Sequence, residues 1–218
     1  MKTLVFDIET VEDVHYTARD GFLQLLWDDC AAPSNWKDTE KIEAERKRQF
    51  ADKRAKLALT PRTGRICAIA CGWLDSEAVD CFTGTEQEIV RAFLSVLADS
   101  GRCVLAGFNV REFDVPFVAV RASLLGLEVP SWWPFGRFDR GIADARDLLE
   151  DGKLADWLHC FDLPPKTGDG SECADMSEAE LRSYVTNDVI VERQLLRRLA
   201  YAIPALRTTP TETRSVTA

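Results

Sequence analysis

The chain contains 218 residues, 46% of them hydrophobic, and carries a formal net charge of −9 at pH 7. These values allow a substantial core and predict one domain over residues 1–204. The negative net charge argues against a nucleic-acid binder, because phosphate contacts favour Lys and Arg. Bound cations that neutralise part of the negative charge would weaken this argument. No apolar run reaches the roughly 20 residues of a membrane span, and Asp7 and Glu9 interrupt the apolar N-terminal run. We therefore expect a soluble, cytoplasmic protein without a membrane partner.

Seven cysteines are present, and no two of them form a Cys-x-x-Cys pair. Zinc sites and thioredoxin-like redox sites therefore have little support. We expect free thiols, mostly buried, in a reducing compartment.

The predicted elements start with a strand over residues 3–6, followed by an irregular segment. The stretch Trp36 to Leu59 alternates in charge and lacks Gly and Pro, and Glu43 and Lys47 stand at the favourable helical spacing. We interpret this stretch as an exposed helix inserted after the first strand. A solvated face is the simplest role for its charges, and guidance of a nucleic-acid backbone by its basic end is the alternative.

The rest of the chain is predicted to alternate between strands and helices. Strands are expected at 65–74, 78–82, 103–108 and 142–144, helices at 86–98, 114–125, 146–150, 153–161 and 178–200, and a flexible tail at 205–218. Thr85 with Glu88 and Ser177 with Glu180 predict capping boxes at two helix starts. This order indicates an α/β layer fold in which helices flank a mixed central sheet.

Four carboxylates occur in three well-separated segments. Asp7 and Glu9 are two residues apart in an extended segment, so their side chains share a face. Asp114 opens a predicted helix after the segment from Asn109 to Phe113. Tyr184 and Asp188 are four apart in the last helix and share a face there. Like charges gathered by a fold repel one another, so such a cluster indicates bound cations.

Oxygen-rich sites of this kind suit hydrolysis of a phosphodiester. Two divalent ions about 4 Å apart can stabilise both the attacking and the leaving oxygen. Asp7 is placed to bridge two Mg²⁺ or Mn²⁺ ions, with Glu9, Asp114 and Asp188 completing the ligand set. Tyr184 can orient the attacking water, and the ions must supply most of its activation because a phenol is a weak base at neutral pH.

The three segments resemble the motifs of the DEDD-type 3′–5′ exonucleases, the proofreading superfamily with a ribonuclease H-like fold. Phe6-Asp7-Ile8-Glu9-Thr10 is similar to the first motif, Asn109-x-x-x-Phe113-Asp114 to the second and Tyr184-x-x-x-Asp188 to the third. Tyr184 indicates the DEDDy branch, and Ser183 stands where the DEDDh branch has histidine. The stretch 163–171 also resembles a loop of the stand-alone exonucleases similar to the exonuclease domain of B-family DNA polymerases, and the likeness extends from Leu4 to Leu196.

The resemblance implies a three-layer ribonuclease H-like fold and release of 5′-mononucleotides from a nucleic-acid 3′ end. Single-stranded DNA is favoured over RNA as the substrate, and replication or repair proteins are possible partners. Asp7, Glu9, Asp114 and Asp188 would bind two divalent cations, and Tyr184 would orient water. Three further residues would lie near the terminal nucleotide, namely Thr10, Asn109 and Phe113.

Two alternatives remain open at this point. Asp7-Ile8-Glu9-Thr10 loosely resembles the start of the haloacid dehalogenase-like phosphatases, in which Asp7 would be a nucleophile, and Gly168-Asp169-Gly170 resembles their late acidic motif. Glu9 replaces the expected Asp there, and Pro164-Pro165 stands where a buried strand is needed. A catalytically silent domain that binds nucleic acid or a polymerase is the second alternative, although all four acids are present.

Overall fold

The structure is a computed structural model that describes every residue except 20, 137–138, 150, 169, 204–205 and 207–218. Five strands form one sheet in the order β3-β2-β1-β4-β5. β1 pairs antiparallel with β2 and parallel with β4, β2 pairs antiparallel with β3, and β4 pairs parallel with β5. The sheet is therefore mixed, as predicted.

The elements follow the predicted order closely. The strands are β1 (Thr3–Glu12), β2 (Gly64–Trp73), β3 (Asp80–Thr83), β4 (Val104–Gly107) and β5 (Ile142–Asp144). The helices are α1 (Val14–Thr17), α2 (Phe22–Asp28), α3 (Thr39–Ala55), α4 (Glu86–Ser100), α5 (Asp114–Leu124), α6 (Leu154–Cys160) and α7 (Glu178–Leu199). Short 3-10 helices are η1 (Leu57–Leu59), η2 (Ala145–Asp147) and η3 (Gly170–Glu172).

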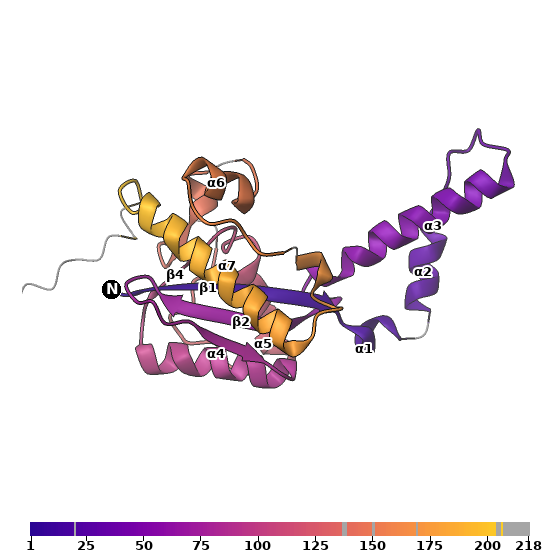
Figure 1. Cartoon of the computed structure of the whole chain (residues 1–218). Helices are drawn as coiled ribbons and strands as arrows, with labels where there is room; N and C mark the ends of the chain where they lie inside the picture. The colour runs from indigo at the N-terminus through magenta and orange to yellow at the C-terminus, as the bar shows by residue number, and fades with distance from the viewer. Residues whose placement is uncertain (20, 137–138, 150, 169, 204–205, 207–218) are drawn as a thin grey trace, which may run out of the picture.

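Helices cover both faces of the sheet and make three layers (Figure 1). Leu4, Phe6 and Ile8 of β1 are buried in the apolar cluster formed with α4 and α5. Val5 points to the opposite face, where it packs in the cluster that contains the apolar residues of α7. Because side chains alternate along a strand, Asp7 and Glu9 also face the α7 side. The predicted three-layer α/β architecture is confirmed.

Two helix starts are held by the capping boxes expected from the sequence. Thr85 and Glu88 cap α4 reciprocally, and Ser177 and Glu180 do the same for α7. In each case the hydroxyl of the cap accepts from a backbone N–H and the glutamate accepts from the backbone N–H of the cap. The second box sets where α7 begins, and hence which of its residues face β1.

The segment between β1 and β2 forms an arm that projects from the body of the molecule (Figure 1). The predicted inserted helix is confirmed as α3 with the Glu43–Lys47 ion pair, although it ends at Ala55 and a 3-10 turn follows. The segment expected to be irregular contains α1 and α2. The ring of Trp27 on α2 packs edge-on against Phe50 of α3, with centroids 5.6 Å apart, a tertiary contact that period alone does not reveal.

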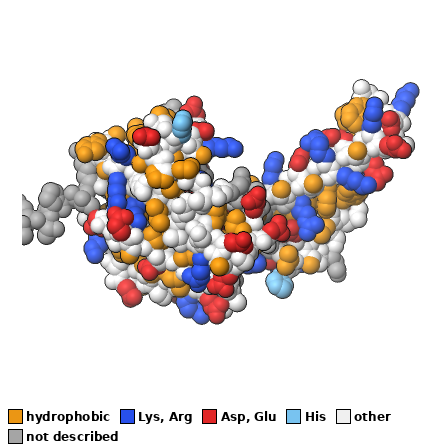
Figure 2. All heavy atoms as spheres, in the orientation of Figure 1, with side chains coloured by type: hydrophobic (Ala, Val, Ile, Leu, Met, Phe, Trp, Pro, Cys, Tyr) orange, Lys and Arg blue, Asp and Glu red, His pale blue; other side chains and the backbone are white. Residues whose placement is uncertain are grey.

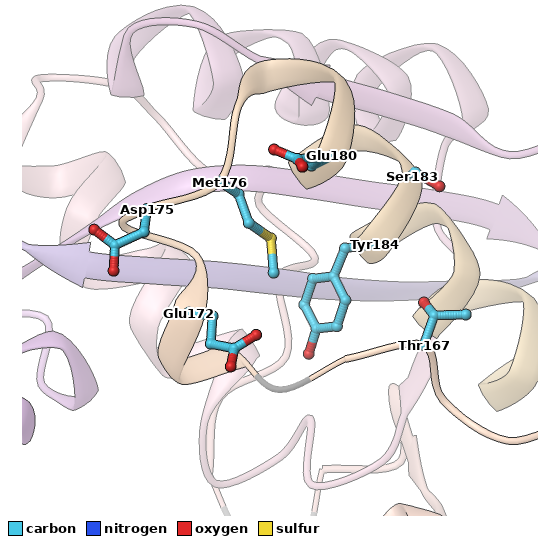
Figure 3. Close-up of a pocket in the computed structure, with 7 residues that line it drawn as sticks. All are labelled: Thr167, Glu172, Asp175, Met176, Glu180, Ser183 and Tyr184. Carbon is cyan, nitrogen blue, oxygen red and sulfur yellow. The ribbon is translucent and has the colours of Figure 1, made fainter.

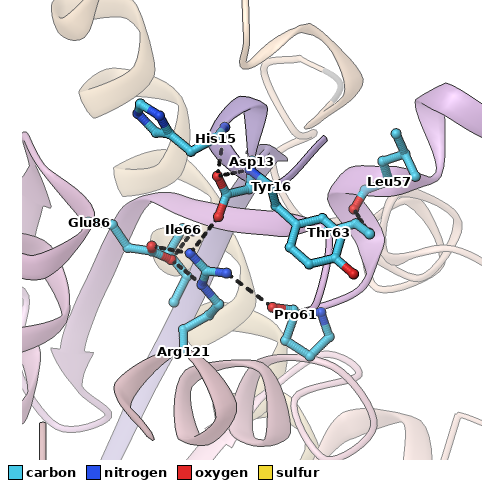
Figure 4. A network of polar contacts seen from close by, with 9 residues as sticks. All are labelled: Asp13, His15, Tyr16, Leu57, Pro61, Thr63, Ile66, Glu86 and Arg121. Carbon is cyan, nitrogen blue, oxygen red and sulfur yellow. Dashed lines mark hydrogen bonds and ion pairs between the residues drawn. The ribbon is translucent and has the colours of Figure 1, made fainter. Parts of the chain in front are cut away.

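A buried ion network ties the foot of the arm to the body (Figure 4). The guanidinium of Arg121 on α5 donates through Nε to Glu86 at 2.7 Å and pairs with Asp13 at 3.0 Å. Glu86 also accepts from the backbone N–H of Ile66 at 2.7 Å. At the same place the backbone N–H of Asp13 donates to the carbonyl of Thr63 at 2.8 Å, so both ends of the arm meet.

Several expectations need correction or lie outside the described residues. The helix expected at 146–150 is a 3-10 turn at Ala145–Asp147, because Asp144 accepts from Arg146 N–H and caps a single turn, and residue 150 is not described. Of the tail expected to be flexible from 205, only Leu206 is described, and it is 2% exposed in the α7-side core. All seven cysteines are free thiols, and Cys160 is exposed. Among the described helices, none is both long and apolar enough to cross a membrane.

Candidate metal centre

Asp7 and Glu9 lie near the middle of β1, on its α7 face. Glu9 is 8% exposed, whereas Asp7 is only partly buried. The pairing of β1 with β2 shifts register between Glu9 and Thr10, where the partners change from Ala68 to Ile66. This irregularity leaves Cys67 unpaired in the ladder beside Glu9, and such bulges turn side chains near functional sites.

α7 places a third carboxylate against the same face. Oxygens of Asp7, Glu9 and Asp188 all lie within 4.8 Å of one another. Asp188 is 1% exposed, and its Oδ1 accepts no hydrogen bond of acceptable geometry from the described residues. A buried carboxylate oxygen in that state is suited to a cation, because desolvation without a partner is costly.

Asp114, the fourth predicted ligand, lies near this group but outside its tightest part. Its Oδ1 accepts the backbone N–H of Ile8 at 3.0 Å, and the residue is 3% exposed. This bond connects the start of α5 to β1 between the two acids of the first motif. The carboxylate of Asp114 raises the pKa of Asp7, which places its charge within electrostatic reach of the cluster.

A fifth carboxylate, Glu192, belongs to the same cluster and was missed in the sequence. It follows Asp188 by four residues on α7 and is 3% exposed. Among the neighbouring charges that raise the pKa of Asp7, Glu192 has the largest effect. The signal was present, since Tyr184, Asp188 and Glu192 repeat at helical spacing on one face.

The cluster holds protons far more tightly than ordinary carboxyls. Burial first, and neighbouring acids second, raise the pKa of Asp7 well above its usual range. Burial raises the pKa of Glu9 to about 7, although the hydrogen bond from the Cys173 thiol opposes the shift. Burial likewise raises the pKa of Asp114 to about 7, against the effect of backbone hydrogen bonds. The pKa of Asp188 is also raised, chiefly by burial.

One described cation pairs with the cluster. Lys166 Nζ lies 2.7 Å from Asp188 Oδ2 and 5.6 Å from the centre of the Tyr184 ring. Five ionised carboxylates against one ammonium would leave four uncompensated negative charges, the charge of two divalent cations. With an all-oxygen donor set of this kind, the residues present fit hard divalent cations. The sequence identified the loop that carries Lys166, but not that it folds back onto Asp188.

Tyr184 forms one wall of a cavity of about 540 Å³, with its hydroxyl directed toward the 167–172 loop (Figure 3). It is 5% exposed, and burial together with Glu9 and Asp188 raises its pKa, so the phenol stays protonated. Gly170 allows this loop to approach: a Cβ there would lie 3.1 Å from Glu9 Oε2 and 3.6 Å from the Tyr184 hydroxyl. The thiol of Cys173 donates to Glu9 Oε2 at 3.3 Å.

Two of the three predicted substrate residues lie next to Glu9, one of the predicted metal ligands. Thr10 and Phe113 line a groove together with Glu9. Asn109 does not line this groove: its backbone N–H donates to Asp144 at 2.8 Å, and its side-chain oxygen accepts from Arg146 at 3.4 Å. Its φ of 71° explains the residue type, since asparagine tolerates the left-handed region. Its contact with a terminal nucleotide stays a prediction.

Comparison with known proteins gives a fold-level likeness. No protein-family model matches the chain, and no curated protein does. The structure is similar to that of a family B DNA polymerase from the hyperthermophilic archaeon Pyrobaculum calidifontis, with a TM-score of 0.59 and 17% sequence identity. The match covers 91% of this chain and 24% of the polymerase, so this chain corresponds to about a quarter of that protein.

Proposed function

We propose that this chain, whose ribonuclease H-like fold matches part of a DNA polymerase, is a metal-dependent 3′–5′ exonuclease. It would hydrolyse phosphodiester bonds at nucleic-acid 3′ ends, preferentially in single-stranded DNA, and release 5′-mononucleotides. The observation that carries the proposal is the approach of Asp7, Glu9 and Asp188 oxygens to within 4.8 Å. Buried carboxylates with raised pKa values, one of which lines a groove, favour a catalytic over a structural role.

The ligands would be Asp7, Glu9, Asp114 and Asp188, which would hold two Mg²⁺ or Mn²⁺ ions. Such ions lower the pKa of an attacking water and neutralise charge on the reacting phosphate. The Ile8 N–H bond to Asp114 fixes the α5 carboxylate relative to β1. Preorganisation of this kind reduces the cost of aligning charged groups during the reaction.

Tyr184 would position the attacking water through its hydroxyl. Because burial and two carboxylates raise its pKa, the phenol remains protonated and acts by hydrogen bonding, not as a base. Lys166 keeps a positive charge beside Asp188, where its own pKa is raised by that carboxylate despite burial. It would compensate the cluster before cations bind.

The test is cleavage of a 5′-labelled single-stranded DNA oligonucleotide, with Mg²⁺ or Mn²⁺ and with EDTA. The wild-type chain should produce a ladder that shortens from the 3′ end, and EDTA or Asp7→Asn should abolish it. Asp99→Asn removes an exposed charge on α4 and serves as the matched control, with unchanged cleavage expected. Full activity of Asp7→Asn, or no cleavage of DNA and RNA by the wild type, would overturn the proposal.

A further inference from the structure

A groove of about 670 Å³ lies between the root of the arm and the edge of the sheet that carries Glu9. We call it the arm groove. Its sheet side includes Thr10 and Val11, its arm side includes Ala51, Ala55 and Leu59, and Phe113 contributes a ring. The volume falls within the range of about 300–1,000 Å³ typical of ligand pockets. Figure 2 shows hydrophobic and acidic side chains where the arm meets the body.

The arm contributes a face of small residues to this groove. Ala51, Ala55 and Ala58 recur at helical spacing toward the groove, and Ala51 and Ala55 are exposed. Alanine methyls leave the space open where longer side chains would fill it. Some of the exposed charges of α3 pair with one another, as Arg48 does with Asp52, and of the charged residues of α3 only Arg54 lines the groove.

The arm groove is continuous with the candidate metal centre, because Glu9 lines the one and belongs to the other. If a phosphodiester is held at the carboxylates, the nucleotides next to it must lie either along the root of the arm or on the side of the candidate metal centre away from the arm. The arm side offers both apolar surface and a cation at its rim. Arg54 is half-exposed and binds Glu12 through Nε at 3.0 Å.

We propose that the arm groove binds the unpaired nucleotides that adjoin the scissile bond, with the inserted arm as one wall. This inference rests on the proposed function and names how its substrate is held. Bases would pack against Phe113 and the alanine face, and Arg54 would contact a phosphate. Base packing of this kind requires unstacked bases, because a duplex keeps them paired inside its helix.

The electrostatics of the arm agree with such an occupant. α3 carries six Lys or Arg against four Asp or Glu, within a chain whose net charge is −9. The arm wall is thus the less acidic side of a groove whose other end carries the carboxylates. A strand that runs from the cation-binding end toward this wall would meet one further carboxylate, Glu12, whose charge Arg54 compensates.

The test is strand binding measured by fluorescence anisotropy in the Asp7→Asn background, where turnover does not interfere. Ala55→Glu places volume and charge in the groove and should weaken binding of a labelled hexathymidylate about tenfold, close to the value of losing one stacked base. Ala44→Glu is the matched control, with the same change on the same helix at an exposed position outside the groove, and should bind like its parent. Circular dichroism checks that both remain helical.

A second pair of variants tests the phosphate contact. Arg54→Gln should weaken binding and reduce the slope of log affinity against log salt by about 1. Arg48→Gln removes an arginine of the same helix that is ion-paired with Glu45 and Asp52 outside the groove, and it should leave that slope unchanged. Equal slopes for the two variants would remove Arg54 from the interface.

The outcomes separate this inference from the proposed function. Equal weakening by Ala55→Glu and Ala44→Glu, or duplex bound as tightly as single strand, would overturn the groove even if the wild type is an active exonuclease. Selective weakening by Ala55→Glu would support the groove even if no cleavage is found. A matched RNA strand is titrated in parallel, and the same sensitivity to Ala55→Glu there supports a groove that accepts either sugar.

Discussion

Raising the pH should destabilise the metal-free protein. Glu9 and Asp114 have pKa values raised to about 7, so their native carboxyls bind protons more tightly than they do in the unfolded chain. The stabilisation is fully present below their ordinary pKa values and is lost as the pH rises through about 7. The loss of stability is therefore expected between about pH 5 and about pH 8. A protein stabilised by ionised carboxylates would instead gain stability as the pH rises over this range.

The magnitude follows from one residue. Glu9 is 8% exposed, and a shift from 4.5 to about 7 corresponds to about 3 kcal/mol of unfolding free energy across the window. For a chain of this size, that change lowers the Tm by roughly 6–12 °C. Divalent cations that bind only the native state should cancel it, by about 2.7 kcal/mol at a hundred times their dissociation constant.

The assay is thermal and urea unfolding in EDTA across this window, repeated with Mg²⁺ or Mn²⁺. Asp7→Asn removes a charge from the cluster and should flatten the pH dependence, while Asp99→Asn on the surface should retain it. Stability that stays level or rises between pH 5 and 8 in EDTA would refute the assignment of a strained acidic cluster. If Mg²⁺ or Mn²⁺ stabilised the wild type and Asp7→Asn equally, the metal would bind somewhere other than this carboxylate cluster.

Three further substitutions test other parts of the structure. Arg121→Met leaves the buried Glu86 without its partner and should lower the unfolding free energy by about 3 kcal/mol in urea titrations. Gly170→Ala introduces a Cβ 3.1 Å from Glu9 Oε2 and should weaken Mn²⁺ binding about tenfold by calorimetry. Tyr184→Phe should lower kcat on an oligonucleotide about 100-fold while Mn²⁺ affinity stays unchanged, because it removes only the water-orienting hydroxyl.

Each of these has its own contrary result, and two of them have a matched control variant. Arg91→Met changes an exposed arginine on α4 and should cost little, so equal losses for Arg91→Met and Arg121→Met would deny the network its role. Unchanged Mn²⁺ affinity in Gly170→Ala would show that the loop yields without moving Glu9. Tyr16→Phe, on the arm, is the match for Tyr184→Phe, and a loss of metal affinity in the latter would mean that its hydroxyl is misassigned.

The sequence predicted the fold where local patterns and burial agree. Alternating and continuous apolar runs predicted the strands, and the boxes at Thr85 and Ser177 predicted the starts of α4 and α7, because capping is decided within a few residues. The prediction was wrong for α1, which the side chain of Asp13 caps, and for α2, whose Trp27 packs against Phe50 across the arm. Contacts between distant residues of this kind leave no periodic signal.

The candidate site was predictable to a similar degree. The three motifs named acids that the fold brings close, since strand and helix periodicity determine which side chains share a face. Two partners, Lys166 and Cys173, could not be placed, because the loops that carry them are positioned by tertiary packing. Glu192 could have been found by extending the Tyr184–Asp188 spacing one turn.

The hydrogen bond between Asp13 and Thr63 makes the whole arm, in topological terms, the loop of one β-hairpin. Closing a loop of roughly fifty residues instead of about six costs only about 2 kcal/mol, because the entropy grows with the logarithm of length. The length and sequence of the arm can therefore diverge while the register that aligns Asp7 and Glu9 with α7 is retained. On the proposed function, the arm would bind the nucleic-acid strand and the sheet with α7 would hold the catalytic carboxylates. Strand binding could then change in evolution while the cleavage site is retained.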